Sequence, residues 1–260
     1  MRVAGLDMGS LTTKATIIDD GTIIAESLIA ATDEGEAQGR KTLEEALKGT
    51  GLSLGDIDYI VVTGEGRKTV SFAHKQKTTA SCLARGTHWL FPSARMVIDV
   101  GGENCTVVKI TDEGSVEESF TNDRCASGTG VFLEAMAKLM QMPLEEMAKL
   151  SLQAERKAEI SSMCAIFAEQ EVISHVHRPT PKNDIIAGIH ASMVSRIVGF
   201  AKRIGIKPDV ILTGGVAKNV GFAKILEEVL KTKLSIPDEP QMVAALGAAR
   251  FAQEGKARKS

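Results

Sequence analysis

Two short segments of the sequence combine a carboxylate, a glycine turn and hydroxyl groups. Residues 7–14 read DMGSLTTK, and residues 99–102 read DVGG. Glycine turns bring backbone amides close to a ligand, and hydroxyl and lysine side chains add donors for phosphate oxygens. A carboxylate beside such a turn can hold hydrated Mg²⁺. Either segment alone is also typical of an ordinary strand and turn, but the two together favour phosphate binding.

The two segments belong to an internal repeat. Residues 3–20 and 95–113 both read as an apolar strand that ends in Asp, a glycine-containing turn and a second β-rich strand. Aligning the two aspartates also aligns the glycines that follow them. We therefore predict two β-hairpins, one opening each of two lobes, with turns at Asp20-Gly21 and Glu113-Gly114 closing the second strands.

A third strand and turn are predicted at residues 209–219, where Thr213-Gly214-Gly215 follows an apolar run. Neither a Walker GxxxxGK[ST] motif nor a GxGxxG dinucleotide turn is present. Apolar spacing, with Pro and Gly as stop signals, predicts helices at about 36–48, 78–90, 129–141, 144–150, 164–176, 183–204, 221–230 and 242–254.

The length and composition fit an α/β protein of two lobes. The chain has 260 residues, 43% of them apolar and 25% charged. We place the boundary near Phe91-Pro92, so that residues 1–92 form the first lobe and 93–241 the second. The final helix, within 242–260, is predicted to pack back on the first lobe.

The charge pattern disfavours nucleic acid and membrane as partners. The net charge is −2, and lysines and arginines are scattered among acidic residues rather than gathered in a patch. The first residues lead directly into a predicted strand without a charged and apolar leader. We therefore expect a cytoplasmic protein.

Four cysteines add a second possible chemistry. Cys82, Cys105, Cys125 and Cys164 include no CxxC pair, which excludes a zinc knuckle or a self-contained ferredoxin motif. Without a secretory leader, disulfides are not expected. Each cysteine is then either a small buried apolar residue or a reactive or metal-binding thiol.

The three strand-and-turn segments resemble the two phosphate motifs and the adenosine motif of the superfamily of acetate and sugar kinases, heat-shock proteins and actin. This resemblance implies a two-lobed fold of duplicated ribonuclease-H-like domains, with ATP and Mg²⁺ in the cleft between the lobes. It implies that Asp7 and Asp99 organise Mg²⁺ or the attacking water. The residues that it places near the phosphates and the nucleoside are Gly9, Ser10, Leu11, Thr12, Thr13, Lys14, Gly101, Gly102, Gly214, Gly215 and Asn219.

Two further segments resemble a narrower family. Residues 122–132 (NDRCASGTGVF) and 161–174 (SSMCAIFAEQEVIS) are similar to the cluster motifs of the activators of 2-hydroxyacyl-CoA dehydratases and of the ATP-binding subunits of benzoyl-CoA reductase. The resemblance implies that Cys125 and Cys164 bind iron. A cubane 4Fe-4S cluster takes four thiolates, so two cysteines per chain imply a homodimer with one cluster on its two-fold axis. Cys82 and Cys105 match no cluster motif.

The implied activity is ATP-driven electron transfer at low potential. By resemblance, the dimer receives an electron from ferredoxin or flavodoxin and passes it to a 2-hydroxyacyl-CoA dehydratase, a benzoyl-CoA reductase or a double-cubane-cluster reductase. One residue departs from the family pattern, because Glu103-Asn104 stands where the family usually has Gln-Asp. Glu103 could orient the attacking water or accept its proton, and it could also repel the γ-phosphate.

Two other functions fit parts of the sequence. A small-molecule kinase of the same superfamily would share the phosphate turns but would contain no iron. A non-catalytic, actin-like regulatory module would bind nucleotide without turnover. Iron content and ATP hydrolysis of the anaerobically purified protein distinguish the three.

Overall fold

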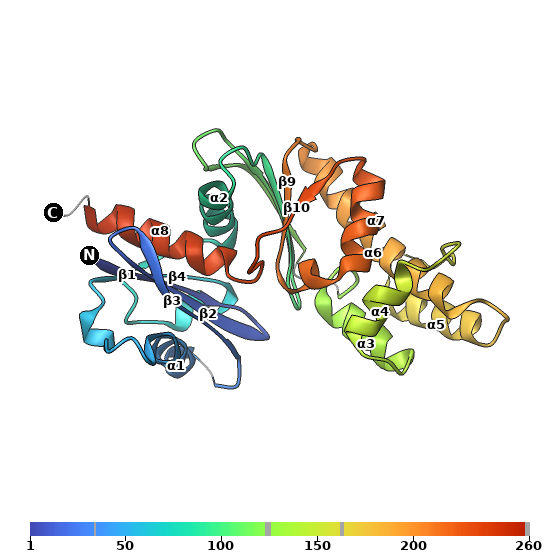
Figure 1. Cartoon of the computed structure of the whole chain (residues 1–260), viewed down its shortest axis with the longest axis horizontal. Helices are drawn as coiled ribbons and strands as arrows, with labels where there is room; N and C mark the ends of the chain where they lie inside the picture. Colours follow the sequence, from blue (N-terminus) through green and yellow to red (C-terminus); the bar gives the residue numbers. More distant parts are fainter. Residues whose placement is uncertain (34, 123–125, 162–163, 258–260) are drawn as a thin grey trace. The chain divides into compact units, whose positions relative to one another are not determined.

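The computed structural model describes residues 1–33, 35–122, 126–161 and 164–257 (Figure 1). The chain forms two compact units. Unit 1 comprises Met1–Ser93, Ile110–Glu117 and Gln241–Ser260, and unit 2 comprises Ala94–Lys109 and Glu118–Pro240. This division differs from the predicted lobes at residues 110–117, which group with unit 1. In that segment the carbonyl of Glu113 accepts a hydrogen bond from Arg85, at 3.3 Å.

Unit 1 is built on a mixed five-stranded sheet in the order β3-β2-β1-β4-β5. The predicted first hairpin is confirmed, because β1 and β2 pair antiparallel. The turn to β3 has positive φ at both Asp20 and Gly21, as a tight two-residue hairpin loop requires. The strands are β1 (Arg2–Met8), β2 (Thr12–Asp19), β3 (Thr22–Ala30), β4 (Tyr59–Thr63) and β5 (Lys75–Gln76).

Unit 2 repeats this sheet in the order β10-β9-β6-β7-β8. The central strand β6 pairs antiparallel with β7 and parallel with β9, just as β1 pairs with β2 and β4. The internal repeat therefore covers five strands in each unit, whereas the sequence predicted only the hairpins. The strands are β6 (Met96–Val100), β7 (Cys105–Ile110), β8 (Val116–Asn122), β9 (Val210–Thr213) and β10 (Leu234–Ser235).

Helices cover both faces of the unit 1 sheet (Figure 1). Alternate residues of β1 point to opposite faces, so Leu6 packs with the α1 residue Leu43 while Val3 packs with the α8 residue Leu246. The helical segments are α1 (Gly35–Leu47), α2 (Thr79–Leu90) and α8 (Val243–Ala257), with short 3₁₀ turns η1 (Leu54–Asp56) and η2 (Glu65–Thr69).

Unit 2 contains a larger apolar core centred on α6. Methionines, valines and isoleucines of this helix are buried against β6, α3 and α7. Helix α6 is long and apolar enough to cross a membrane by length and composition, but 78% of its most apolar window is buried inside the protein. The helical segments are α3 (Gly130–Leu139), α4 (Leu144–Ser151), α5 (Ala165–Val176), α6 (Lys182–Ile204), α7 (Val220–Leu230) and the 3₁₀ turn η3 (Gly215–Lys218).

Helix α8 packs so closely within unit 1 that glycine is required at the contacts. A Cβ atom on Gly247 would lie 1.8 Å from the carbonyl oxygen of Cys82 in α2. A Cβ atom on Gly5 of β1 would lie 2.0 Å from the carbonyl oxygen of Ala245. The C-terminal helix is thus held by backbone-to-backbone contact with α2 and β1.

We predict that Gly247→Ala destabilises the protein by about 2–3 kcal/mol or more, because the added methyl group forces α2 and α8 apart. Urea unfolding followed by circular dichroism measures this loss. Gly199→Ala is the matched control, since Gly199 is exposed within α6 and its Cβ would meet nothing within 4 Å. The control should gain up to about 1 kcal/mol from helix propensity. Equal stability of Gly247→Ala and wild type would contradict the close packing.

Candidate functional site

The first predicted phosphate turn lies between β1 and β2. Asp7 and Lys14 are direct partners in this hairpin, and the Lys14 ammonium nitrogen lies 3.2 Å from Asp7 Oδ2. Both side chains are largely buried, at 13% and 9% exposure. The same ammonium group also donates to the carbonyl oxygen of Thr12, at 3.3 Å. Lys14 is therefore held at the turn, where a charged donor for phosphate was predicted.

The residues of this turn differ in what they offer a ligand. Ser10 and Leu11 are exposed at its tip, whereas a Cβ on Gly9 would approach the Thr12 carbonyl oxygen to 2.7 Å. Thr13 is buried, and its hydroxyl contacts Thr42 and accepts from Gln38, both at 2.7 Å. The Thr13 hydroxyl thus anchors the hairpin to α1, which leaves its backbone for a phosphate.

The second phosphate turn follows β6 in unit 2. The amide of Gly101 donates to the carbonyl oxygen of Asn104 at 2.8 Å, which closes the turn. The carbonyls of Gly101 and Gly102 then accept hydrogen bonds from the amides of Gly130 and Val131, each at 2.8 Å. Helix α3 therefore begins directly on the phosphate turn. Glu103 is exposed beside it.

Asp99 is joined to the predicted nucleoside turn at the end of β9. The Thr213 hydroxyl donates to Asp99 Oδ1 at 2.8 Å, and the two residues are register partners. Gly214 has φ of 85°, and a Cβ there would lie 2.4 Å from the carbonyl oxygen of Val100. Only glycine fits this close approach to β6. The turn thus sits immediately beside the strand that carries Asp99.

Asn219 ends the nucleoside turn and begins α7. Its side-chain oxygen accepts the Phe222 amide at 2.9 Å, as a helix N-cap does. Its side-chain nitrogen lies 3.1 Å from Nε2 of His190, whose Nδ1 lies 2.9 Å from the Ser151 hydroxyl. The Asn219 side chain is thus engaged with protein, and its predicted contact with a nucleoside stays a prediction.

Sequence reasoning missed His190 as a residue of the site. It appeared as an isolated histidine within a predicted core helix, and no spacing relates it to Ser151 or Asn219. In the structure it is fully buried, and burial lowers its pKa to about 4. A polar residue within the apolar stripe of α6 was the signal that could have found it.

The cysteines fall into two environments. Cys164 is partly exposed at the N-cap of α5, where the helix amides carry partial positive charge. Cys82 and Cys105 are buried, and burial raises the pKa of Cys82 to about 12 and also raises the pKa of Cys105. These two are protonated thiols rather than ligands, as expected. Cys125 lies outside the described residues.

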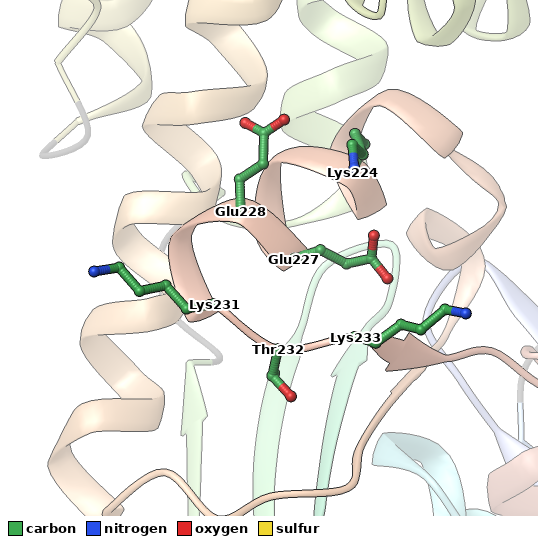
Figure 2. A pocket seen from close by; sticks show the side chains of 6 residues that line it. All are labelled: Lys224, Glu227, Glu228, Lys231, Thr232 and Lys233. Carbon is green, nitrogen blue, oxygen red and sulfur yellow. The ribbon is translucent and has the colours of Figure 1, made fainter.

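A surface pocket elsewhere in unit 2 lies at the C-terminal end of α7 (Figure 2). Its Glu227 carboxylate accepts the Leu234 amide, and Glu228 forms an ion pair with Lys157 at 2.8 Å. Lys231 and Lys233 extend in opposite directions. Since its charges do not converge on one point, the pocket offers no defined ligand position.

Comparison with known proteins identifies the family. The family model described as BadF/BadG/BcrA/BcrD ATPase matches residues 4–252. The chain belongs to this ATPase family. It is 42% identical to the activator of lactoyl-CoA dehydratase from Anaerotignum propionicum over 259 residues, which cover 100% of both chains.

Solved structures agree with this assignment. The activator of the 2-hydroxyisocaproyl-CoA dehydratase from Clostridium difficile with bound ADPNP superposes with a TM-score of 0.92 at 39% identity, covering 100% of this chain and 97% of that one. MreB 5 of Spiroplasma citri bound to AMPPNP matches with a TM-score of 0.59 at 12% identity, covering 99% and 98%. The latter likeness concerns the fold alone. The predicted actin-like ATPase fold and the family resemblance are confirmed.

For this family member, we predict that Asp7→Asn and Asp99→Asn each lower kcat for Mg-ATP hydrolysis at least about 100-fold, because each removes a charge that organises metal or water. A phosphate-release assay at saturating Mg-ATP measures the loss. Asp238→Asn, which removes an exposed carboxylate elsewhere in unit 2, should retain wild-type turnover. Wild-type turnover in both site variants would remove these aspartates from the catalytic site.

We also predict a pH dependence of stability that originates at His190. Because burial lowers its pKa from 6.5 to about 4, the unfolded chain takes up a proton before the folded chain does. The stabilisation is complete above pH 6.5 and is lost as the pH falls toward 4, with roughly 2 kcal/mol lost by pH 5. Urea unfolding of wild type and His190→Gln at pH 7 and pH 5 tests this. The stability difference between the two proteins should shrink at pH 5, and a constant difference would refute the assignment.

Proposed function

We propose that this ATPase is the one-electron donor of a partner iron–sulfur enzyme of the 2-hydroxyacyl-CoA dehydratase, benzoyl-CoA reductase or double-cubane-cluster type. It acts in the cytoplasm as a homodimer that holds one 4Fe-4S cluster through Cys125 and Cys164 of each copy. Ferredoxin or flavodoxin reduces it, and Mg-ATP hydrolysis drives the transfer. The observation that carries the proposal is the 42% identity, along the whole chain, to an activator of lactoyl-CoA dehydratase.

The nucleotide part of the proposal rests on the two glycine turns. Lys14 is held beside Asp7 by an ion pair, so its ammonium group is positioned to neutralise phosphate charge. Asp99 is oriented by the Thr213 hydroxyl and supplies a carboxylate for Mg²⁺. Exposed Glu103 then orients water or accepts its proton during hydrolysis.

The chemistry of the thiols supports Cys164 as an iron ligand. A ligating cysteine must be deprotonated, and the N-terminus of α5 favours negative charge at Cys164. Buried Cys82 and Cys105 have raised pKa values and lack access for iron. When bound, the cluster supplies a single electron at low potential. Cys125 enters the proposal through its sequence motif alone.

Helix α5 offers an apolar surface beside Cys164. Ile166 and Phe167 follow this cysteine directly and are 64% and 59% exposed, and Val176 at the end of the helix is 52% exposed. Large apolar side chains in such a cluster favour burial against another protein surface. A second copy of the chain, bound around a shared cluster, would cover the residues nearest Cys164.

Hydrogen bonds connect the phosphate turn with the cysteine-containing segment. The amides of Gly130 and Val131 donate to the carbonyls of Gly101 and Gly102. Gly130 lies five residues after Cys125 in the sequence. A change of the phosphate turn between ATP and ADP would therefore move the start of α3, and with it the end of the Cys125 segment.

The experiment that tests the proposal compares iron in cysteine variants. Anaerobically purified wild type should contain about four irons per dimer, because the thiolate shell closes only across two copies. Cys164→Ser should lose the iron and the visible absorption, since symmetry removes two ligands at once. It should still bind ATP, because the phosphate turns lie on other elements.

Cys105→Ser is the matched control, since it removes a thiol from a buried strand and should retain iron. A colourless wild-type protein that phosphorylates a small molecule would favour a kinase instead. Full iron in Cys164→Ser, together with loss in Cys105→Ser, would overturn the ligand assignment.

A further inference from the structure

A buried chain of hydrogen bonds lies behind the predicted nucleoside turn. His190 of α6 contacts the hydroxyl of Ser151 at the end of α4 and the side-chain nitrogen of Asn219, at 2.9 and 3.1 Å. Their exposures are 0%, 6% and 9%. Three elements that are distant in sequence thus meet at one imidazole ring.

The direction of each hydrogen bond follows from Asn219. Its side-chain oxygen accepts the Phe222 amide, so its side-chain nitrogen must donate to Nε2 of His190. A neutral imidazole with an accepting Nε2 carries its proton on Nδ1, which therefore donates to the Ser151 hydroxyl. The ring thus has one defined tautomer, and each ring nitrogen has a partner.

The nucleoside turn is fixed at both of its ends. At its start, the Gly214 amide donates to the Pro240 carbonyl at 2.8 Å, and Gly214 packs against Val100. At its end, the Asn219 amide donates to the Val216 carbonyl at 2.9 Å, and the Asn219 side chain caps α7. His190 is the group that holds this second end against the helices behind it.

The start of α7 also packs tightly on α4 at this point. A Cβ atom on Gly221 would lie 2.6 Å from the Ala148 carbonyl oxygen and 3.0 Å from the Ser151 hydroxyl oxygen. The Ser151 hydroxyl therefore faces both His190 and the first turn of α7. A displacement of Asn219 cannot be absorbed by a gap, because the surrounding side chains are buried.

We propose that His190 is a positioning residue for nucleotide binding, which fixes the Gly214–Asn219 turn through its hydrogen bonds to Asn219 and Ser151. The inference rests on the proposed function, in which this turn borders the nucleoside. His190 does not touch the nucleotide. It acts through Asn219, and its loss leaves the turn in several arrangements, of which only some bind ATP.

The test measures ATP affinity by calorimetry, and KM and kcat for ATP hydrolysis, in His190→Leu. Leucine fills the buried space but bonds to neither partner, so we expect Kd and KM to rise about tenfold, with kcat at saturation little changed. Ile197→Ala is the control for general destabilisation, because Ile197 is buried in the same helix two turns away. It should bind ATP like wild type, and equal weakening in both variants would overturn the inference.

A double-mutant cycle identifies the route of the effect. Asn219→Ser retains an oxygen that can cap α7 but is too short to reach His190. If His190 acts through Asn219, adding His190→Leu to Asn219→Ser weakens ATP binding no further, whereas additive effects would refute the route. Should His190→Leu not fold, Ser151→Ala replaces it in the cycle with a smaller expected effect. A wild type that binds no ATP would instead refute the proposed function.

Discussion

The arrangement of unit 2 depends on two hydrogen bonds between backbone groups. The carbonyls of Gly101 and Gly102, in the phosphate turn, accept the first amides of α3. The turn can lie this close because Gly130 has no Cβ, which would otherwise approach the Gly101 carbonyl to 3.1 Å. The phosphate turn and the start of α3 therefore move together. This contact gives the motif GTG after Cys125 a physical reason beyond sequence similarity.

Helix α6 provides the frame for the segments that surround the other cysteine. Near its start, the Asp184 carboxylate accepts the amides of Glu155 and Arg156, each at 3.1 Å. One turn later, Gly188 packs against Ala158, where a Cβ would lie 2.3 Å from the carbonyl oxygen. His190 follows and holds the nucleoside turn. The chain leading toward Cys164 and the nucleoside turn are thus fixed to adjacent turns of one helix.

Local patterns predicted much of this architecture, and long-range contacts account for the rest. The hairpins and helices carry glycine turns, apolar periodicity and stop signals, which act over a few residues. The strand β4 was not predicted, because all five of its residues are buried and it shows no alternation. The role of His190 and the direction of the Thr13 hydroxyl arise from partners that are distant in the sequence, so no spacing reveals them. The cysteine motifs were recognised by resemblance, since spacing alone left both as ordinary thiols.

The duplicated sheets also explain why the two equivalent turns differ in function. Gly64 after β4 and Gly214 after β9 have nearly the same backbone angles, with φ of 88° and 85°. In each case a Cβ would lie 2.4 Å from the carbonyl oxygen of the residue after the aspartate. The turn of unit 1 then ends at Val70 without a following helix, whereas the turn of unit 2 continues through Asn219 into α7. Only the unit 2 turn has a capped helix and a buried histidine behind it, so gene duplication supplied the backbone device twice and the polar anchor made one copy rigid enough to hold a nucleoside.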